Sequence, residues 1–525
     1  MQKQPITYLE YLKNPTLIAI VIALLTTGFL RLQLLTGNPE TDGGIYTFAS
    51  QYFYHALVNG EIIQGPPLFF YQLITAWVYG LDVNQFILLR AIDGLVAVTA
   101  SIVLFKVILK ESDSTLFTLL FMVPLLIVMN DLEVVMYGFR NSIWAAYLPL
   151  FSAILIWQNS TKKDKYSFYL IGGLVSLGVL LREPFLPFFL LVGIAIFIGY
   201  GWRVLFKYLI GSAVVGFSIL GFLLMLRGWD LIDLFESYIS LSLGIGGPKW
   251  TFPLAMLELN WFIFLAGIIS IAYIVKLYLS DKKLVNMRRF YLWVLIALLP
   301  ILEIISKESY IYHYANLLPG LVGLTALSWK YMSNQESKKI KVIAFMLIGV
   351  MSLLITLPKI NSYLGKDSFI IKPSYVMSFA PRNSFRYKAM IENSQYLITA
   401  KEIYELSRAD STLASTGMMQ ALFPLTGLLP PTYQFCDLYT IFKYYDFDEG
   451  KLIELFLQHR PTLIITPGNV WEGGKVDARY EQSLHRVIEK TNLYDKIKTI
   501  LGSDTVHYGW LFEKPGIIYR LKDFK

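Results

Sequence analysis

The sequence predicts a polytopic α-helical membrane protein with a small C-terminal α/β domain. Its 525 residues are 55% hydrophobic and only 16% charged, whereas soluble globular chains carry about 25% charged residues. Apolar runs recur along the first two-thirds of the chain, and runs of about 17–25 residues are long enough to cross a hydrocarbon core of about 30 Å. From Lys359 onward short β-rich segments alternate with helical patterns, which is typical of an α/β domain.

About eleven spans follow from the apolar runs. The first is too long and too poorly bounded for a cleaved signal peptide, so it is interpreted as a retained signal anchor. Residues 1–358 form the predicted transmembrane domain, with a first extracytoplasmic loop at 36–83, and residues 359–525 form the predicted extracytoplasmic domain. The spans are predicted near 15–35, 84–108, 114–129, 142–158, 167–181, 184–200, 204–226, 252–279, 290–305, 314–331 and 340–357.

Basic residues concentrate in every second loop, which the positive-inside rule assigns to the cytoplasm together with the N-terminus. An odd number of spans then places the C-terminal part outside an integral plasma (inner) membrane. The net charge of +8 is explained by this topology, so no nucleic-acid partner is expected. The basic loop residues are Lys106, Lys110, Lys162, Lys163, Lys165, Arg203, Lys207, Lys282, Lys283, Arg288, Arg289, Lys338, Lys339 and Lys341.

The remaining loops carry nearly all the other charge beside the membrane, on the predicted extracytoplasmic side. Any chemistry is therefore expected on that side. These residues are Glu40, Asp42, Asp131, Glu133, Arg140, Arg182, Glu183, Lys249, Lys307, Glu308 and His313.

In the C-terminal part, helices are predicted at 394–408 and Glu449–His459, and strands at 412–415, 462–466 and 516–521. The chain has no Walker A sequence and no GxGxxG, so nothing supports a nucleotide site. Cys436 is the single cysteine, which excludes an intramolecular disulfide and a thiolate metal site.

The first extracytoplasmic loop begins a helix just after two acidic residues. The helix is too short to span and has an apolar stripe, so it is expected to lie in the membrane interface. Asp42 precedes it, and Gly43 and Gly44 allow a close approach of the backbone to another group. Asp42 is either an N-cap or a general base kept ionised by the helix dipole; both roles are compatible. The apolar positions are 45, 48, 49, 52, 53, 56 and 57, with the spacing of one helical face.

Several motifs occur in a characteristic order on the predicted outer side. The acidic loop and its helix are followed by PPLFFY at 66–71 and by Leu89-Arg90 at the start of a span. LLREPFLPF at 180–188, YIYHYANLLPGLVGL at 310–324 and STGMMQALFPLTGLLPP at 415–431 come later. In this order the chain resembles the GT-C class of integral-membrane glycosyltransferases. Within it, the most similar branch contains the lipid A aminoarabinose transferase and the protein O-mannosyltransferases.

The resemblance implies an inverting glycosyltransferase that uses a sugar linked to a polyprenyl phosphate, such as undecaprenyl phosphate. The acceptor would be a hydroxyl or phosphate of an envelope lipid, glycan or protein on the extracytoplasmic face. By position, Asp42 would deprotonate the acceptor hydroxyl, while Glu40 would tune its pKa or remain a solvated loop charge. Arg90 lies toward the outer end of its span, and the alternative to a role in the site is a simple anchor at the membrane interface.

The departing lipid phosphate requires cations or oriented donors. Lys249 lies in the glycine-rich stretch 244–250 and is a candidate, although it could equally be an interfacial lysine beside Trp250. Arg140 either lines the site or extends to lipid headgroups.

Two further outer-loop segments supply candidates. Arg182 either binds the phosphate or pairs with Glu183 in a tight turn. His313 and Tyr314 match positions at which the family contacts donor or acceptor, and the alternative for them is a structural role.

Relatives carry an acidic and a basic residue before the Pro-Pro pair, where a metal and the donor phosphate bind. The corresponding residues here are Gln64 and Gly65, so no metal or other cofactor is assigned. Many relatives also carry an acid after the arginine of the second outer loop, where this chain has Asn141 and Ser142.

Two other functional classes remain open. An O-antigen ligase or polymerase keeps its large catalytic loop late in the chain, which the early acidic loop disfavours. A transporter or flippase carries ionisable groups inside its spans, whereas these spans are nearly free of charge. The C-terminal domain either binds the acceptor or caps the site.

Overall fold

The computed structural model describes 14–35, 41–64, 70–81, 83, 85–135, 143–161, 164, 166–182, 185–234, 236, 252–280, 286–298, 300, 304, 311–333, 339–364, 395–415, 419–436, 438, 449–466, 471–472, 475–476, 478–500 and 516–524. Within these ranges the backbone alone is described at 33, 41–43, 132–133, 252, 311, 333, 339–341, 361–364, 395–398, 471–472, 475–476 and 478–483.

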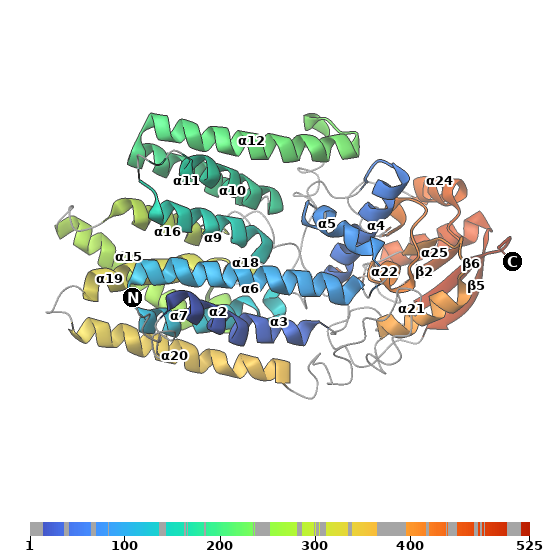
Figure 1. Ribbon diagram of the computed structural model, residues 1–525. Coiled ribbons are helices and arrows are strands. Elements are labelled where there is room, and N and C mark those ends of the chain that lie inside the picture. Colours follow the sequence, from blue (N-terminus) through green and yellow to red (C-terminus); the bar gives the residue numbers. More distant parts are fainter. Residues whose placement is uncertain are drawn as a thin grey trace, which may run out of the picture.

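The N-terminal part of the chain is a bundle of long helices that run side by side (Figure 1). Described helices overlap every predicted span. The bundle contains α2 (Pro15–Ala23), the π-helical turn η1 (Leu24–Gly28), α3 (Phe29–Leu34), α6 (Gln85–Ser112), α7 (Thr115–Met129), α9 (Ile143–Asn159), α10 (Ser167–Leu181), α11 (Leu186–Tyr200), α12 (Trp202–Arg227), α15 (Trp261–Ser280), α16 (Met287–Leu298), α19 (Leu318–Ser333) and α20 (Lys339–Leu364).

Among the described residues, 5 helices are long and apolar enough to cross a membrane. They are supported by large apolar side chains that point away from the protein, as Phe217 and Met225 do on α12. The protein is therefore a helical membrane protein with a small C-terminal sheet, and the number of eleven spans stays a prediction. The 5 helices lie at Pro15–Leu32, Gln85–Ser112, Trp202–Arg227, Trp261–Ser280 and Val342–Ile360.

Two predicted boundaries differ from the structure. The span predicted at 252–279 is two helices, α14 (Phe252–Leu259) and α15, with Asn260 between them. The Asn260 carboxamide oxygen accepts from the Ile263 N–H at 3.3 Å, so this side chain starts α15. The predicted domain boundary after residue 358 falls inside α20, and the division into domains stays a prediction.

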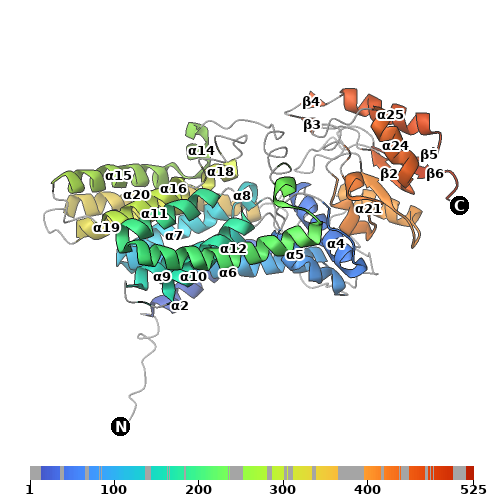
Figure 2. The same ribbon diagram turned by 90° about the horizontal axis from the view of Figure 1, so that it is seen from above.

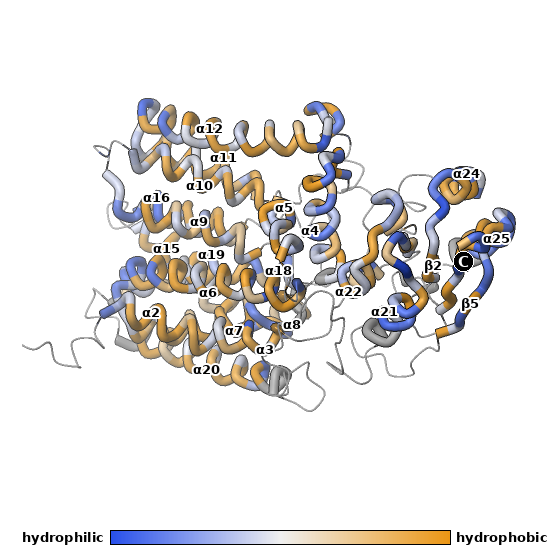
Figure 3. The backbone as a smooth tube through the Cα atoms, turned by 45° about the vertical axis from the view of Figure 1, so that its right-hand side comes forward, coloured by the Kyte–Doolittle hydropathy of each residue, from blue (hydrophilic) through white to orange (hydrophobic). Residues whose placement is uncertain are grey.

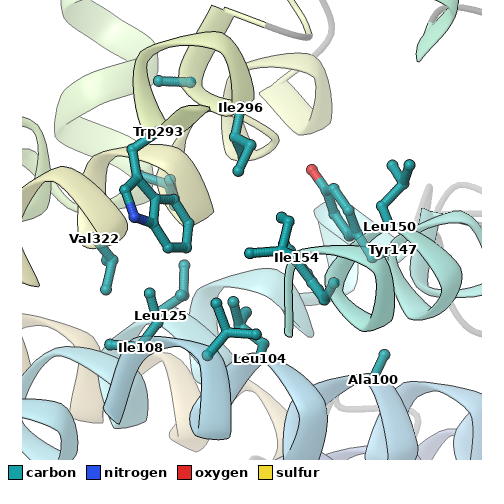
Figure 4. Close-up of a cluster of buried hydrophobic side chains, with 14 of the residues drawn as sticks. Ala100, Leu104, Ile108, Leu125, Tyr147, Leu150, Ile154, Trp293, Ile296 and Val322 are labelled. Carbon is teal, nitrogen blue, oxygen red and sulfur yellow. The ribbon is translucent and has the colours of Figure 1, made fainter. Parts of the chain in front are cut away.

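The centre of the bundle is a continuous apolar core that joins α6, α7, α9, α16 and α19. Figure 4 shows Leu104, Ile154 and Trp293 within it, facing one another from three helices. At its edge, α10 and α12 approach so closely that a Cβ at Gly211 would lie 2.0 Å from the Tyr169 carbonyl oxygen. Small residues of this kind let helices pack by direct backbone contact inside a membrane.

The two ends of the bundle differ in character. At the end where the N-terminus lies, here called the basic end, polar residues mark the helix termini (Figures 1 and 3). The opposite end is here called the domain end. It carries the C-terminal α/β unit and the helical segments 41–59 and 70–80 of the first loop (Figures 1 and 2). Described bases at the basic end include Lys110, Arg203, Lys207, Arg288, Arg289 and Lys330.

The helix predicted in the first loop is confirmed as α4 (Thr41–Asn59). It packs against α5 (Phe70–Thr75) and the 3-10 turn η2 (Ala76–Gly80). Its stripe is enclosed by protein: Phe48, Ala49 and Phe53 are buried. Most of the stripe is therefore covered by other parts of the chain, although Leu57 is exposed, and the position of the helix at the membrane interface stays a prediction.

The start of α4 also corrects the role considered for Asp42. The helix begins at Thr41, so Asp42 lies in its first turn and not at the N-cap position. The predicted close approach at Gly44 is confirmed, since a Cβ there would lie 2.6 Å from the Ala421 Cβ. Gly44 thus lets α4 dock directly against the C-terminal unit.

The C-terminal unit is a four-stranded sheet in the order β1-β2-β6-β5, with helices packed around it. The first two strands are parallel and the others antiparallel. The predicted helices and strands are confirmed, and β5 and α25 add to them. Its elements are α21 (Gln395–Leu406), β1 (Leu413–Ser415), α22 (Leu422–Thr426), the 3-10 turn η6 (Tyr433–Cys436), α24 (Glu449–His459), β2 (Leu463–Thr466), β3 (Trp471–Glu472), β4 (Lys475–Val476), α25 (Ala478–Thr491), β5 (Tyr494–Ile500) and β6 (Gly516–Leu521).

Candidate functional site

The domain end brings together residues that are distant in the sequence. Arg182 is the C-cap residue of α10 and is buried. Its guanidinium carbon lies 5.6 Å from the ring centroid of Phe185, at a cation–π distance. Phe185 in turn stacks on Tyr147 of α9, with ring centroids 5.5 Å apart.

Tyr147 extends these contacts to a third segment. Its hydroxyl donates to the side-chain oxygen of Asn316 at 2.9 Å. Asn316 directly follows α18 (Ile311–Ala315), the short helix that contains His313 and Tyr314. An unbroken series of contacts therefore joins the Arg182 turn to the segment with His313, as the shared side of the predicted topology suggested.

His313 and Tyr314 are more enclosed than the sequence implied. His313 is 3% exposed and its ring centroid lies 4.1 Å from that of Tyr312. The helix α18 packs against α14 and α8 (Leu132–Val135). A residue in such a setting is held by protein and can change its contacts only when a neighbouring segment moves.

Asp131, which the sequence predicts to lie in an outer loop, belongs to an ion-pair group. Lys359 of α20 contacts Asp131 at 3.2 Å and Glu258 of α14 at 3.6 Å. Three chain segments are thereby tied together next to α18. The sequence marks Lys359 only as the residue after which the composition changes from apolar runs to an α/β pattern. Its ion-pair partners lie far away in the chain, so the sequence does not reveal them.

A second polar group lies inside the bundle and was missed by the sequence analysis. Arg31 of α3 and Asp93 of α6 form an ion pair at 2.7 Å, and each side chain is 5% exposed. Asn130 accepts from the Arg31 Nε at 2.9 Å. The Tyr71 hydroxyl of α5 donates to Asp93 at 3.3 Å.

The same group continues toward the π-helical turn. The Asn130 amide donates to the Thr27 hydroxyl at 3.2 Å, and Thr27 and Ser101 share a hydrogen bond of 2.9 Å. We call Thr27, Arg31, Tyr71, Asp93, Ser101 and Asn130 the paired network. Because Arg31 and Asp93 fall within predicted spans, the view that the spans are nearly free of charge is corrected: among their charged residues is an ion pair of opposite charges inside the bundle.

Two other arginines at the domain end are also buried. Arg90 was considered an interface anchor, but its guanidinium donates to the Leu34 carbonyl at 3.2 Å and so satisfies the end of the first span. Arg227, at the end of α12, lies 4.8 Å from the ring centroid of Trp229 and 6.0 Å from that of Phe53. No sequence signal separated Arg227 from an ordinary residue at a span end.

The face of α4 that carries Phe48 is covered by the C-terminal unit. Phe48 lies 4.8 Å from Phe423 and Tyr52 lies 5.1 Å from Tyr433, measured between ring centroids. Burial raises the pKa of Tyr52 to about 12, and Glu61 and Cys436 add to this effect. Tyr52 is therefore a neutral phenol at physiological pH and is unsuited to act as a base.

Several predicted site residues lie outside what the structure describes. These are Glu40, Arg140 and Lys249, whereas for Asp42 the backbone alone is described, in the first turn of α4. Of the two positions discussed for a metal, Gln64 is exposed and Gly65 is not described. Among described residues, no three His, Cys, Asp or Glu side chains gather in a way that could hold a metal ion.

Neither the known protein families nor the curated proteins include a match to this chain.

Proposed function

We propose that the chain is an inverting glycosyltransferase of the GT-C class. It would transfer a sugar from a polyprenyl-phosphate donor to a hydroxyl or phosphate of an envelope lipid, glycan or protein. The reaction would take place at the domain end, on the extracytoplasmic face of the membrane.

One observation carries the proposal: candidate residues from separate sequence motifs meet at one end of an apolar bundle. The contacts from Arg182 through Phe185 and Tyr147 to Asn316 join two motifs of the resemblance. The first-loop helix α4 lies at the same end and is covered by the C-terminal unit. This combination suits a lipid-linked donor, whose chain requires apolar helices while its head group requires polar partners.

The proposed chemistry assigns each residue a role. Asp42 accepts the proton of the acceptor hydroxyl, whose oxygen bonds to the anomeric carbon as the bond from that carbon to the phosphate oxygen breaks. A first-turn carboxylate is kept ionised by the positive end of the helix dipole. Arg182, with Arg140 and Lys249, balances the charge of the departing polyprenyl phosphate.

The acceptor side of the site is assigned to α18 and the C-terminal unit. His313 and Tyr314 contact donor or acceptor, and Glu40 adjusts the pKa of Asp42. Membrane lipids would surround the bundle, and the lipid-linked donor would reach the site by lateral diffusion in the bilayer.

The experiment compares wild type with Asp42→Asn and Lys249→Ala in membranes, following transfer from a panel of radiolabelled undecaprenyl-phosphate sugars. Loss of a general base lowers the rate by about 10²–10⁴-fold, so we expect Asp42→Asn to abolish measurable transfer at normal expression. Lys249→Ala should weaken transfer less, because other cations remain. Asp113→Asn is the matched control: Asp113 is an exposed carboxylate that pairs with Lys330 at the basic end. Wild-type transfer by Asp42→Asn would remove the base from the proposal.

The second candidate is a transporter or flippase, and the Arg31–Asp93 pair favours it, because ionisable residues inside a bundle often mark a transport path. Reconstituted vesicles distinguish the two functions. Movement of a labelled lipid-linked sugar across the bilayer without transfer to any acceptor would support transport. Transfer without such movement would support the glycosyltransferase.

A further inference from the structure

Several buried side chains at the domain end have polar atoms with no hydrogen-bond partner among the described residues, and three of them are considered together. Both amide atoms of Gln72 are in this state, as are the indole N–H of Trp144 and the amide nitrogen of Asn316. Gln72 and Asn316 are 0% exposed and Trp144 is 2% exposed. Folded proteins contain few such groups, and each has to be explained. We call these three residues the orphan set.

Two members of the orphan set flank the same phenol. Trp144 and Tyr147 lie one turn apart on α9, with ring centroids 6.3 Å apart and edge to face. The side-chain oxygen of Asn316 accepts a hydrogen bond from the Tyr147 hydroxyl, and the side-chain nitrogen of Asn316 has no partner among the described residues. Turning the amide around would leave its oxygen over instead, so one amide atom is unsatisfied in either orientation.

The third member lies on a neighbouring element. Gln72 is on α5, which packs against α4 and also against α10. Arg182 ends α10 and leads through Phe185 to Tyr147. Gln72 therefore lies on a helix that contacts both the first-loop helix and α10, and α10 ends at the Arg182 turn that leads to Tyr147.

The chemistry of the orphan set favours a hydroxyl-rich ligand. The amide of Gln72 has an NH2 group that donates and an oxygen that accepts, and hydroxyl groups can bond both because they accept and donate. A fully ionised phosphate only accepts, so it would leave the Gln72 oxygen unsatisfied. The Trp144 indole ring supplies apolar surface next to these polar atoms, whereas the Tyr147 ring is stacked on Phe151 and Phe185.

We propose that Gln72, Trp144 and Asn316 form a subsite that binds the sugar of the donor through its hydroxyl groups. This proposal rests on the proposed function. It adds the residues that bind the sugar, as distinct from those that bind the phosphate. The polar atoms are enclosed in this conformation, so binding includes side-chain rotations that turn them toward the ligand.

The orphan set can be tested because its removal affects binding and folding differently. Replacing a buried unsatisfied polar group by an apolar group of similar shape is neutral or stabilising. A purely structural role for these atoms therefore predicts variants that fold and bind like wild type. A sugar subsite predicts variants that fold at least as well but bind the sugar donor more weakly.

The experiment uses the full-length protein in detergent with Gln72→Leu and Trp144→Phe. Binding is measured for undecaprenyl phosphate carrying one hexose, for the same lipid carrying one pentose, and for bare undecaprenyl phosphate. We expect the Kd of the preferred sugar lipid to rise about five- to tenfold, as for one lost hydrogen bond. The Kd of the bare lipid should stay unchanged. The melting temperature should stay unchanged or rise.

Trp293→Phe is the matched control. The buried indole N–H of Trp293 also has no partner within the described ranges, but Trp293 lies on α16 in the bundle core (Figure 4). It should leave both Kd values unchanged. Equal weakening of the sugar lipid and the bare lipid, or no change in either, would overturn the subsite while leaving the glycosyltransferase proposal intact. Failure of wild type to bind or transfer any sugar lipid would overturn both.

Discussion

The paired network and the orphan set are both buried polar groups in one helical protein, yet they are built in opposite ways. In the paired network Arg31 and Asp93 neutralise each other, and Asn130 and Tyr71 complete the hydrogen bonds. In the orphan set neither amide atom of Gln72 has a partner in the described part of the chain. The contrast teaches that burial alone does not reveal what a polar residue does. A satisfied group stabilises the fold, whereas an unsatisfied one is costly unless a ligand completes it.

The largest effect is expected from Asp93→Leu. This change leaves the Arg31 guanidinium buried without its carboxylate, and breaking a buried pair in this way costs about 3–5 kcal/mol of unfolding free energy. Denaturant unfolding in detergent micelles measures the loss. The control is the double variant Arg31→Met with Asp93→Leu, which should recover most of it, since no charge stays behind. Equal stability of the single variant and wild type would show that the pair is not part of the stable core.

The next largest effect is expected from Asn130→Ala. Asn130 bonds the Arg31 side chain, the Thr27 hydroxyl and the Leu126 carbonyl, at 2.9, 3.2 and 2.7 Å. Polar contacts between membrane helices contribute about 0.6 kcal/mol each, so the two bonds to Arg31 and Thr27 predict a loss of about 1.2 kcal/mol. The bond to Leu126 lies within the same helical segment. Asn159→Ala, at an exposed position, should change the same unfolding free energy by less than about 0.5 kcal/mol. A loss no larger than this control would place Asn130 outside the network.

A smaller effect is expected from Tyr71→Phe. The variant keeps the ring and removes only the hydroxyl that donates to Asp93 at 3.3 Å, a bond that contributes about 1 kcal/mol. Thermal melting of the purified protein measures the change. Tyr166→Phe serves as the control because Tyr166 is largely exposed. If Tyr71→Phe has the same melting temperature as wild type, α5 is held by its apolar contacts alone.

The smallest effect is expected for a buried hydroxyl that no described residue bonds. Ser328 on α19 is buried and its hydroxyl is unsatisfied among the described residues, so Ser328→Ala should change the unfolding free energy by no more than about 0.5 kcal/mol or raise it. Ser270 on α15 is equally buried but donates to the Ala266 carbonyl at 2.7 Å. Ser270→Ala should therefore lose more stability than Ser328→Ala, and the reverse order would undermine the distinction between paired and orphan groups.

Much of the fold could be predicted from local sequence patterns. Apolar runs identify the bundle helices, and the spacing of apolar residues after Ile45 identifies α4, because both signals arise within one helix. The strand β5 was missed: its middle residues, including Lys496 and Lys498, are exposed, so the apolar alternation is lost. The helix α25 was missed as well, and its polar composition hides it among loop segments.

The candidate site was less predictable because its contacts join distant segments. Arg182 and His313 were recognised from motifs, but the link between them through Phe185 and Tyr147 depends on how three helices meet. Arg31 and Asp93 lie 62 positions apart, and each looks like a lone charge near a span end when considered by itself. The orphan state of Gln72 cannot be predicted from sequence at all, since it is a property of its surroundings.

The docking of α4 has a consequence for how the chain is assembled during synthesis. Gln51 donates to the Leu428 carbonyl, a partner 377 positions later in the chain, and Gly44 meets Ala421. The ribosome therefore completes α4 long before its covering exists, while chain segments emitted first generally fold first. Phe48 and Tyr52 stay without their final neighbours until the last fifth of the polypeptide has emerged, so closure of the domain end is a late event in biogenesis. A premature stop codon after Leu364 and before residue 421 would leave every described bundle helix encoded and the domain end unfinished.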